Sequence, residues 1–74
     1  MKDQNTMGVI ISLLDKGYGF IGVSGYDKNI FFHAKDCSGI RFEDLQKGDK
    51  VEIGEIRKKN DGYSAHNVSL ITVG

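Results

Sequence analysis

The chain has 74 residues with ten basic and ten acidic side chains, so its formal net charge is zero, and it contains one cysteine and no proline. This length excludes a two-domain enzyme, one cysteine excludes an internal disulfide, and zero net charge makes any contact with a polyanion depend on local patterning. Isoleucine and valine together number 13, against four leucines and two alanines, and ten glycines accompany them. This β-branched, turn-rich composition favours short strands over a helical bundle.

Alternation of apolar and polar residues predicts five strands. They cover residues 7–14, 18–23, 29–33, 50–57 and 63–73. The first ends at the turn Asp15-Lys16-Gly17, the last two are joined by an Asp-Gly hairpin turn, and a change of phase at Gly54 predicts a β-bulge. One long connection, residues 34–49, is expected to contain a turn or one helical turn at 35–39, with Phe42 and Leu45 as anchors.

Five short strands with one long connection after the third fit an all-β Greek-key closed barrel of the OB-fold type. Closure also removes the exposed strand edges that would make such a chain aggregate. Residues 1–74 are interpreted as a single domain with its ordered core at about 7–73. The apolar runs near the N-terminus, Val9 to Ile11 and Leu13 to Leu14, are too short for a signal peptide or a membrane span, so we expect a soluble, cytoplasmic monomer.

Catalytic and metal-binding constellations are not recognisable in the sequence. No histidine partner is evident for the hydroxyl and thiol groups of Ser12, Ser64 and Cys37, so an enzyme is not predicted. Two histidines and one cysteine do not make a zinc ligand set, so neither a metal nor another cofactor is expected. Cys37 is interpreted as a small buried apolar residue.

Aromatic residues are concentrated in the second and third predicted strands, where alternation separates two faces. The apolar face, which we predict to be the core, carries Ile21, Ile30 and Phe32. The outer face carries the rings of Tyr18, Phe20, Phe31 and His33. Several exposed rings on neighbouring strands indicate an interaction site. Tyr26 and Tyr63 are expected to pack at turns or strand edges.

Lysines lie at or near the ends of the same strands, at positions 16, 28 and 35. Rings for stacking with cations at the rim suit single-stranded nucleic acid, because every base has a π-face and every nucleotide has a phosphate. Lys16, Lys28 and Lys35 are therefore candidate phosphate contacts. Lys58 and Lys59 in the last hairpin are further candidates, although a solvated charge run also explains them.

At these residues the sequence resembles the cold shock domain, a five-stranded OB-fold family that binds single-stranded RNA and DNA. Residues 16–21, Lys-Gly-Tyr-Gly-Phe-Ile, are similar to the first ribonucleoprotein motif of that family, and residues 29–33, Asn-Ile-Phe-Phe-His, are similar to the second. The similarity extends from about Gly8 to Leu70. The RNA-recognition motif has the two motifs in the opposite order, with helices between its strands, so the cold shock family fits better.

The resemblance implies ligand contact at Lys16, Tyr18, Phe20, Phe31 and His33, with Phe42 as a further candidate. It also implies an RNA chaperone that keeps bases unpaired by mass action, without ATP. The family usually has Val-Lys-Trp-Phe-Asn in the first strand, where residues 9–13 here are Val-Ile-Ile-Ser-Leu, and phenylalanine at the position of Ala34. Each stacked base contributes about 1 to 3 kcal/mol, so weaker and salt-dependent binding is expected.

Two alternatives remain open. Phe42 is explained equally well as a residue that pins the long connection. Ile10 and Ile11 cannot both face the core of a regular strand, so one of them is expected on or beside the outer face. A divergent OB-fold module that uses these isoleucines and the rings to bind a protein, with weak or no nucleic-acid binding, is the alternative function.

Overall fold

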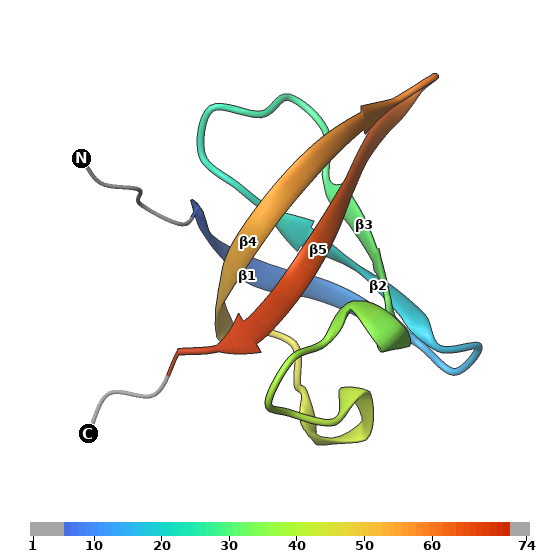
Figure 1. Cartoon of the computed structure of the whole chain (residues 1–74), viewed down its shortest axis with the longest axis vertical. Helices are drawn as coiled ribbons and strands as arrows, with labels where there is room; N and C mark the ends of the chain where they lie inside the picture. Colours follow the sequence, from blue (N-terminus) through green and yellow to red (C-terminus); the bar gives the residue numbers. More distant parts are fainter. Residues whose placement is uncertain (1–5, 72–74) are drawn as a thin grey trace.

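Five strands close into a barrel in the order β1-β2-β3-β5-β4 (Figure 1). The computed structural model describes residues 6–71. The strands are β1 (Thr6–Leu14), β2 (Tyr18–Gly22), β3 (Ile30–His33), β4 (Lys50–Lys59) and β5 (Gly62–Leu70). Two 3-10 helices, η1 (Ala34–Asp36) and η2 (Phe42–Asp44), lie between β3 and β4. The predicted all-β barrel is confirmed; β5 ends at Leu70, and residues 72–73 of the predicted last strand lie outside the described residues.

Tight turns join β1 to β2 and β4 to β5. Gly17 has a φ of 96°, which residues with a side chain rarely adopt, and its N–H donates to the carbonyl of Leu14 at 3.0 Å. The second turn consists of residues 60 and 61, because Lys59 pairs with Gly62. The predicted Asp-Gly turn is therefore shifted by one residue, and Gly62 is the first residue of β5.

Alternate side chains of the strands fill the barrel. The core comprises Ile10, Ile21, Val23, Ile30, Phe32, Leu45, Val51, Ile53, Ala65 and Val68. Complete burial of a large apolar side chain contributes about 1.5 to 3 kcal/mol. Ile21, Ile30 and Phe32 have no exposed surface, which confirms the predicted core face of β2 and β3.

A β-bulge lies in β1. Ile10 pairs with Ile21, whereas Ser12 pairs with Phe20, so Ile11 is an extra residue between two regular pairs. Ile10 is 2% exposed and Ile11 is 43% exposed. The expectation that one of the two isoleucines leaves the core is confirmed, and the bulge decides which one.

The prediction of a β-bulge at Gly54 was wrong. Ile53 pairs with Val68, and the register of β4 against β5 continues unchanged to the hairpin. Near Gly54, Asn67 of β5 adopts a φ of 58°, a left-handed conformation that few residues other than glycine take. A side chain at Gly54 would place its Cβ 2.9 Å from the Cβ of Asn67, so glycine permits this close approach.

The barrel closes along the seam between β3 and β5. One parallel pair, Phe31 with Ser64, joins these strands. Beyond η1 the seam continues with Cys37, which bridges Val68, and with the N–H of Ser38, which donates to the carbonyl of Val68 at 2.7 Å. Few main-chain contacts hold this seam, so side chains that cross it matter for closure.

The connection between β3 and β4 packs against the barrel. Leu45 is 5% exposed and belongs to the core, and the ring centroid of Phe42 lies 5.8 Å from that of Phe32. Both residues therefore anchor the connection as predicted, and η1 is the predicted helical turn. No helix within residues 6–71 is long and apolar enough to cross a membrane.

Candidate functional site

Three aromatic rings contact one another on the outer face of β2 and β3. The ring centroid of Phe31 lies 5.5 Å from that of Tyr18 and 6.0 Å from that of Phe20, and the centroids of Tyr18 and Phe20 are 6.2 Å apart. Such tilted and edge-to-face contacts stabilise an aromatic pair by about 0.5 to 1.5 kcal/mol. All three side chains are half-buried. These residues, here named the ring cluster, are thus held in position while part of each ring meets solvent.

Strand register explains why the rings meet. Phe20 of β2 pairs with Phe31 of β3, and paired residues point to the same face of a sheet. The row continues with Ser12 on β1 and Ser64 on β5. Both flanking side chains are small, and that of Ser64 is buried. The predicted outer face of β2 and β3 is therefore confirmed as an arrangement of side chains.

His33 lies on the same face, paired with Tyr18. Its Nδ1 accepts a hydrogen bond from the N–H of Lys35 at 3.2 Å, and its own N–H donates to Oδ2 of Asp36 at 3.0 Å. Because Nδ1 is an acceptor, a neutral His33 carries its ring proton on Nε2. That nitrogen makes no hydrogen bond within residues 6–71, so it is free to donate to a ligand.

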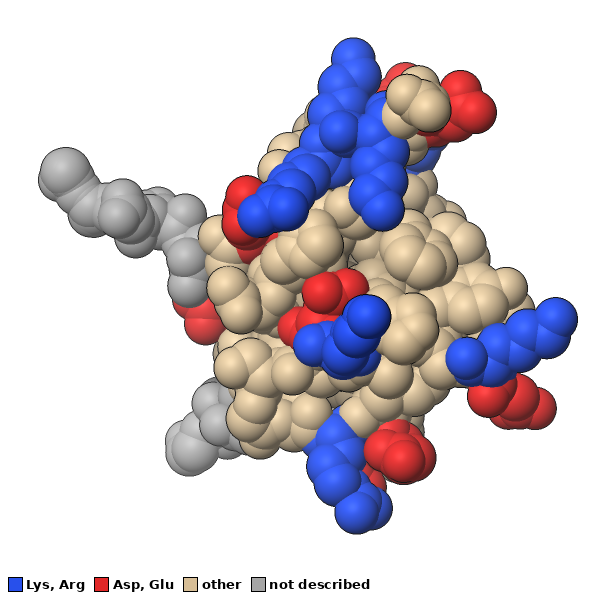
Figure 2. All heavy atoms as spheres, turned by 45° about the vertical axis from the view of Figure 1, so that its right-hand side comes forward, with Lys and Arg blue, Asp and Glu red and all other residues tan. Residues whose placement is uncertain are grey.

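The candidate lysines form two groups at opposite ends of β2 and β3. Lys16 lies in the turn before β2 and Lys35 lies in η1 after β3. The second group comprises Lys28, Lys58 and Lys59. In it, Lys28 Nζ donates to the carbonyl of Asp61 at 3.0 Å, which ties the loop between β2 and β3 to the β4–β5 hairpin. Figure 2 shows basic side chains gathered at the tip of this hairpin with acidic side chains beside them, above a mostly uncharged surface that carries an adjoining acidic and basic group near its centre.

Phe42 is not part of the ring cluster. Its ring contacts that of Phe32 in the core, and it lines a shallow hollow between η2 and the end of β1 together with Leu13, Leu14 and Leu45. The structure therefore shows an anchoring position for Phe42. Its predicted ligand contact remains a prediction.

An apolar strip runs along the exposed side of β1. Met7 is 66% exposed, Val9 is 38% exposed and Ile11 is 43% exposed. The side chain of Ile11 lies over Gly22, where a Cβ would be 3.0 Å from its Cδ1. Ile11 therefore covers β2 just beyond the ring cluster, because Gly22 follows Phe20 by two residues on the same face. We name Met7, Val9 and Ile11 the β1 strip.

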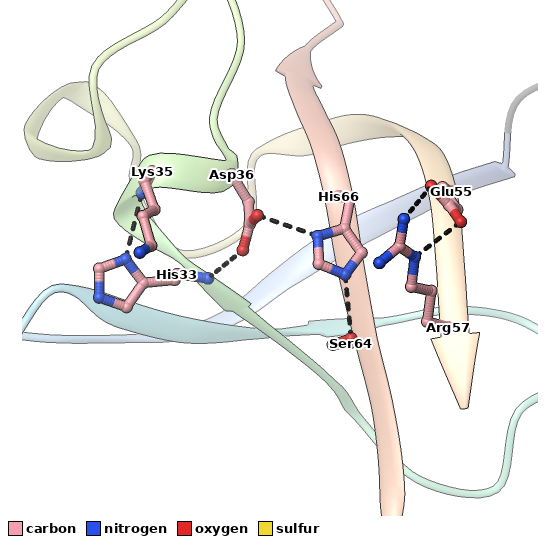
Figure 3. A network of polar contacts seen from close by, with 7 residues as sticks. All are labelled: His33, Lys35, Asp36, Glu55, Arg57, Ser64 and His66. Carbon is pink, nitrogen blue, oxygen red and sulfur yellow. Dashed lines mark hydrogen bonds and ion pairs between the residues drawn. The ribbon is translucent and has the colours of Figure 1, made fainter. Parts of the chain in front are cut away.

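A polar network that the sequence does not predict crosses the seam beside the ring cluster (Figure 3). His66 Nδ1 lies 3.0 Å from Asp36 Oδ1, and His66 Nε2 lies 3.1 Å from Ser64 Oγ. The sequence does not show a histidine partner for Ser64, and the structure places His66 beside it. Ser64 is 2% exposed, so a substrate cannot reach its hydroxyl, and the contact does not make it a nucleophile. Within residues 6–71, no three His, Cys, Asp or Glu side chains are grouped to hold a metal ion.

One part of this network had a signal in the sequence. Ser64 and His66 are two residues apart on a predicted strand, so they share a face. The approach of Asp36 had no such signal, because it lies 30 residues away and depends on how η1 packs against β5.

An ion pair lies on β4 at the edge of the same face. Arg57 Nε donates to Glu55 Oε2 at 2.8 Å, and Arg57 Nη2 donates to Glu55 Oε1 at 3.3 Å. The hydrogen bond from Arg57 lowers the pKa of the Glu55 carboxyl below its usual range, and the charge of Arg57 adds to this effect. Both side chains are exposed, so the pair contributes little to stability. Its electrostatic effect is local. Arg57 pairs with Ser64 of β5, and Glu55 neutralises the charge of Arg57 at that point.

Cys37 is expected to react slowly with iodoacetamide. The residue is half-buried, so the prediction of a buried cysteine was only partly right. Burial raises the pKa of its thiol above the ordinary value of 9.0, and the carboxylates of Asp36 and Glu43 raise it further. Because the thiolate is the reacting form, alkylation of the native chain near neutral pH should be slower than alkylation of the urea-unfolded chain, with the difference narrowing as pH rises. Equal rates near neutral pH would contradict this account.

Comparison with known proteins agrees with this geometry. A family model described as the 'Cold-shock' DNA-binding domain matches residues 6–71, which include all five strands. The chain is 39% identical over 57 residues to a cold shock-like protein of Aquifex aeolicus, covering 77% of this chain and 80% of the relative. It is 36% identical over 57 residues to the major cold shock protein of Micrococcus luteus, covering 77% of this chain and 84% of the relative.

Proposed function

Because the chain belongs to the cold-shock DNA-binding domain family, whose members bind nucleic acid and are not enzymes, we propose that it binds single-stranded RNA or DNA by stacking unpaired bases on the ring cluster and His33. The observation that carries this proposal is the mutual contact of Tyr18, Phe20 and Phe31 on one outer face. Packing between the rings fixes their positions before a ligand arrives, so little conformational entropy is lost on binding.

Phosphates of the bound strand meet the two lysine groups. Lys16 and Lys35 bind phosphates at one end of the ring cluster. At the other end phosphates are bound by Lys28, Lys58 and Lys59. The ammonium group of Lys28 has three donors, so its contact with the Asp61 carbonyl leaves two for a phosphate. The net charge of the chain is zero, so these local cations supply the electrostatic attraction that the overall field does not.

Binding of this kind makes the protein an RNA chaperone. A ligand surface that takes only unpaired bases stabilises the unfolded form of an RNA in proportion to the free protein concentration, without ATP. The first strand adds little to stacking, because Ile10 is buried, Ser12 has no ring and Ile11 is aliphatic. We therefore expect moderate affinity that depends on salt.

Titration with short oligo-U and oligo-dT tests the proposal. The NMR signals of Tyr18, Phe20, Phe31 and His33 should shift, and the logarithm of the association constant should fall with the logarithm of salt concentration by about 0.7 for each neutralised phosphate. Comparing the two oligonucleotides shows whether RNA or DNA binds better. Tight binding that ignores salt would contradict the role given to the lysines.

One observation favours a second candidate function, a protein-interaction module: the exposed β1 strip, with Met7 at 66% exposure. A contiguous exposed apolar strip on a small protein indicates a contact surface for a partner. The same titration separates the two candidates. If neither oligonucleotide moves any ring-cluster signal, the interaction module replaces nucleic-acid binding as the function.

A further inference from the structure

The imidazole of His66 is fixed in one orientation by hydrogen bonds at both nitrogens (Figure 3). The carboxylate of Asp36 can only accept, so Nδ1 of His66 donates to it, and in the neutral ring Nε2 then accepts from the hydroxyl of Ser64. Asp36 also accepts the N–H of His33 through its other oxygen at 3.0 Å. One carboxylate therefore bonds to the ring of His66 and to the main chain of His33.

His66 lies on the outer face, where Asp36 links it to His33. Ser64 of β5 pairs with Phe31 of β3, and His66, two residues beyond Ser64, points to the same face of β5 as Ser64. On its other side His66 pairs with Glu55 of β4. His66 thus lies across the seam of the barrel from His33, with Asp36 bonded to both residues.

A ligand that reaches His66 meets carbon atoms of its side chain rather than its ring nitrogens. Both ring nitrogens are occupied within the chain, yet 29% of the side chain is exposed. An imidazole with its edge satisfied and its face exposed can stack on a base but cannot read the hydrogen-bonding edge of that base. Asp36 is bonded to this ring, and Glu55, the β4 partner of His66, is paired with Arg57, so these charged groups already have partners within the chain.

From these contacts we infer that His66 is a further base-stacking residue, which extends the ring cluster and His33 onto β5. The inference rests on the proposed function, since it places one more base on the same bound strand. It also gives the network of Asp36 and Ser64 a role: the two residues position the His66 ring, and they do not themselves contact the ligand.

The same hydrogen bonds also hold the seam between β3 and β5 together, so the experiment must separate base stacking from this structural role. His66→Gln keeps an amide that can bond to Asp36 and Ser64 but removes the imidazole ring. His66→Phe keeps a ring but loses both hydrogen bonds. If His66 stacks, His66→Gln should bind oligo-U about fivefold more weakly than the native chain, while His66→Phe, which keeps a ring but loses its positioning, should bind more tightly than His66→Gln at a temperature where it is folded. Weaker binding by His66→Phe than by His66→Gln would overturn the inference in favour of a purely structural role for His66.

A second readout does not depend on stability. The ring C–H signals of the two histidines are assigned with His66→Gln, and oligo-U is added to the native chain. The inference expects both rings to shift upfield, because a stacked base shields the protons beneath it. Shifts at His33 and the ring cluster without a shift at His66 would overturn the inference and leave the proposed function intact. No shift at any of these residues would overturn the proposed function itself.

Discussion

Replacing Phe31 with alanine is expected to weaken binding of oligo-U about tenfold or more while the barrel stays folded. Phe31 contacts both other rings of the cluster, with centroid distances of 5.5 and 6.0 Å, so its loss removes one stacking surface and loosens the two that remain. A stacked base contributes about 1 to 3 kcal/mol, and 1.4 kcal/mol corresponds to a factor of ten. Fluorescence anisotropy of labelled oligo-U measures the change.

Tyr26→Ala is the matched control. It also truncates an aromatic side chain that contacts another ring, since the centroids of Tyr26 and Tyr63 are 4.9 Å apart, and Tyr26 is 37% exposed. This pair packs between the β2–β3 loop and β5, as predicted, and is separate from the ring cluster. Affinity should stay close to that of the native chain. A loss as large as that of Phe31→Ala would mean that binding does not depend on the ring cluster.

Gly19→Ala is expected to destabilise the protein by about 1 to 3 kcal/mol or more. The added Cβ would lie 2.5 Å from the carbonyl oxygen of Ser12 and 3.0 Å from Cε1 of Phe32. The first contact is with main chain, which cannot move without disturbing the pairing of β1 with β2. A chain of this size rarely has more than about 3 to 5 kcal/mol of stability, so the loss is a large share. Urea unfolding followed by circular dichroism should show a lower midpoint at an unchanged slope.

Gly62→Ala provides the comparison for Gly19→Ala. A Cβ at Gly62 meets no atom within 4 Å, and its φ is not in the left-handed region. Alanine there should leave stability unchanged or raise it by about 0.4 to 1 kcal/mol, because the unfolded chain loses conformational freedom. If the two variants unfold at the same urea concentration, close packing at Gly19 is not what limits stability.

The predictions for Phe31→Ala and Gly19→Ala concern the two faces of the sheet at the start of β2. Gly19 lies between Tyr18 and Phe20, and its missing side chain lets the core ring of Phe32 pack directly beneath the strand. The neighbours of Gly19 point outward and contact Phe31. The Gly-Tyr-Gly-Phe pattern therefore combines two requirements: close packing inside the barrel and a fixed group of rings outside it.

Local alternation was enough to predict the strands and the two faces of β2 and β3. Side chains in a strand alternate with a period of two, so Tyr18, Phe20 and Phe31 could be separated from Ile30 and Phe32 without knowledge of the fold. The turn at Gly17 and the anchoring of Leu45 also follow from local chemistry. The family resemblance lay in the same residues, which is why the architecture was predicted correctly.

Only the tertiary structure decided the features that depend on register and on barrel closure. A one-residue bulge buries Ile10 and exposes Ile11, and the apolar sequence at these positions permits either arrangement. At Gly54, where the sequence indicates a bulge, the register of β4 against β5 does not shift, and it is Asn67 of β5 that takes a left-handed conformation. Asp36 and His66 meet only because β3 and β5 close the barrel. Contacts between residues so distant in sequence have no local signal, since they form when strands paired elsewhere bring them together.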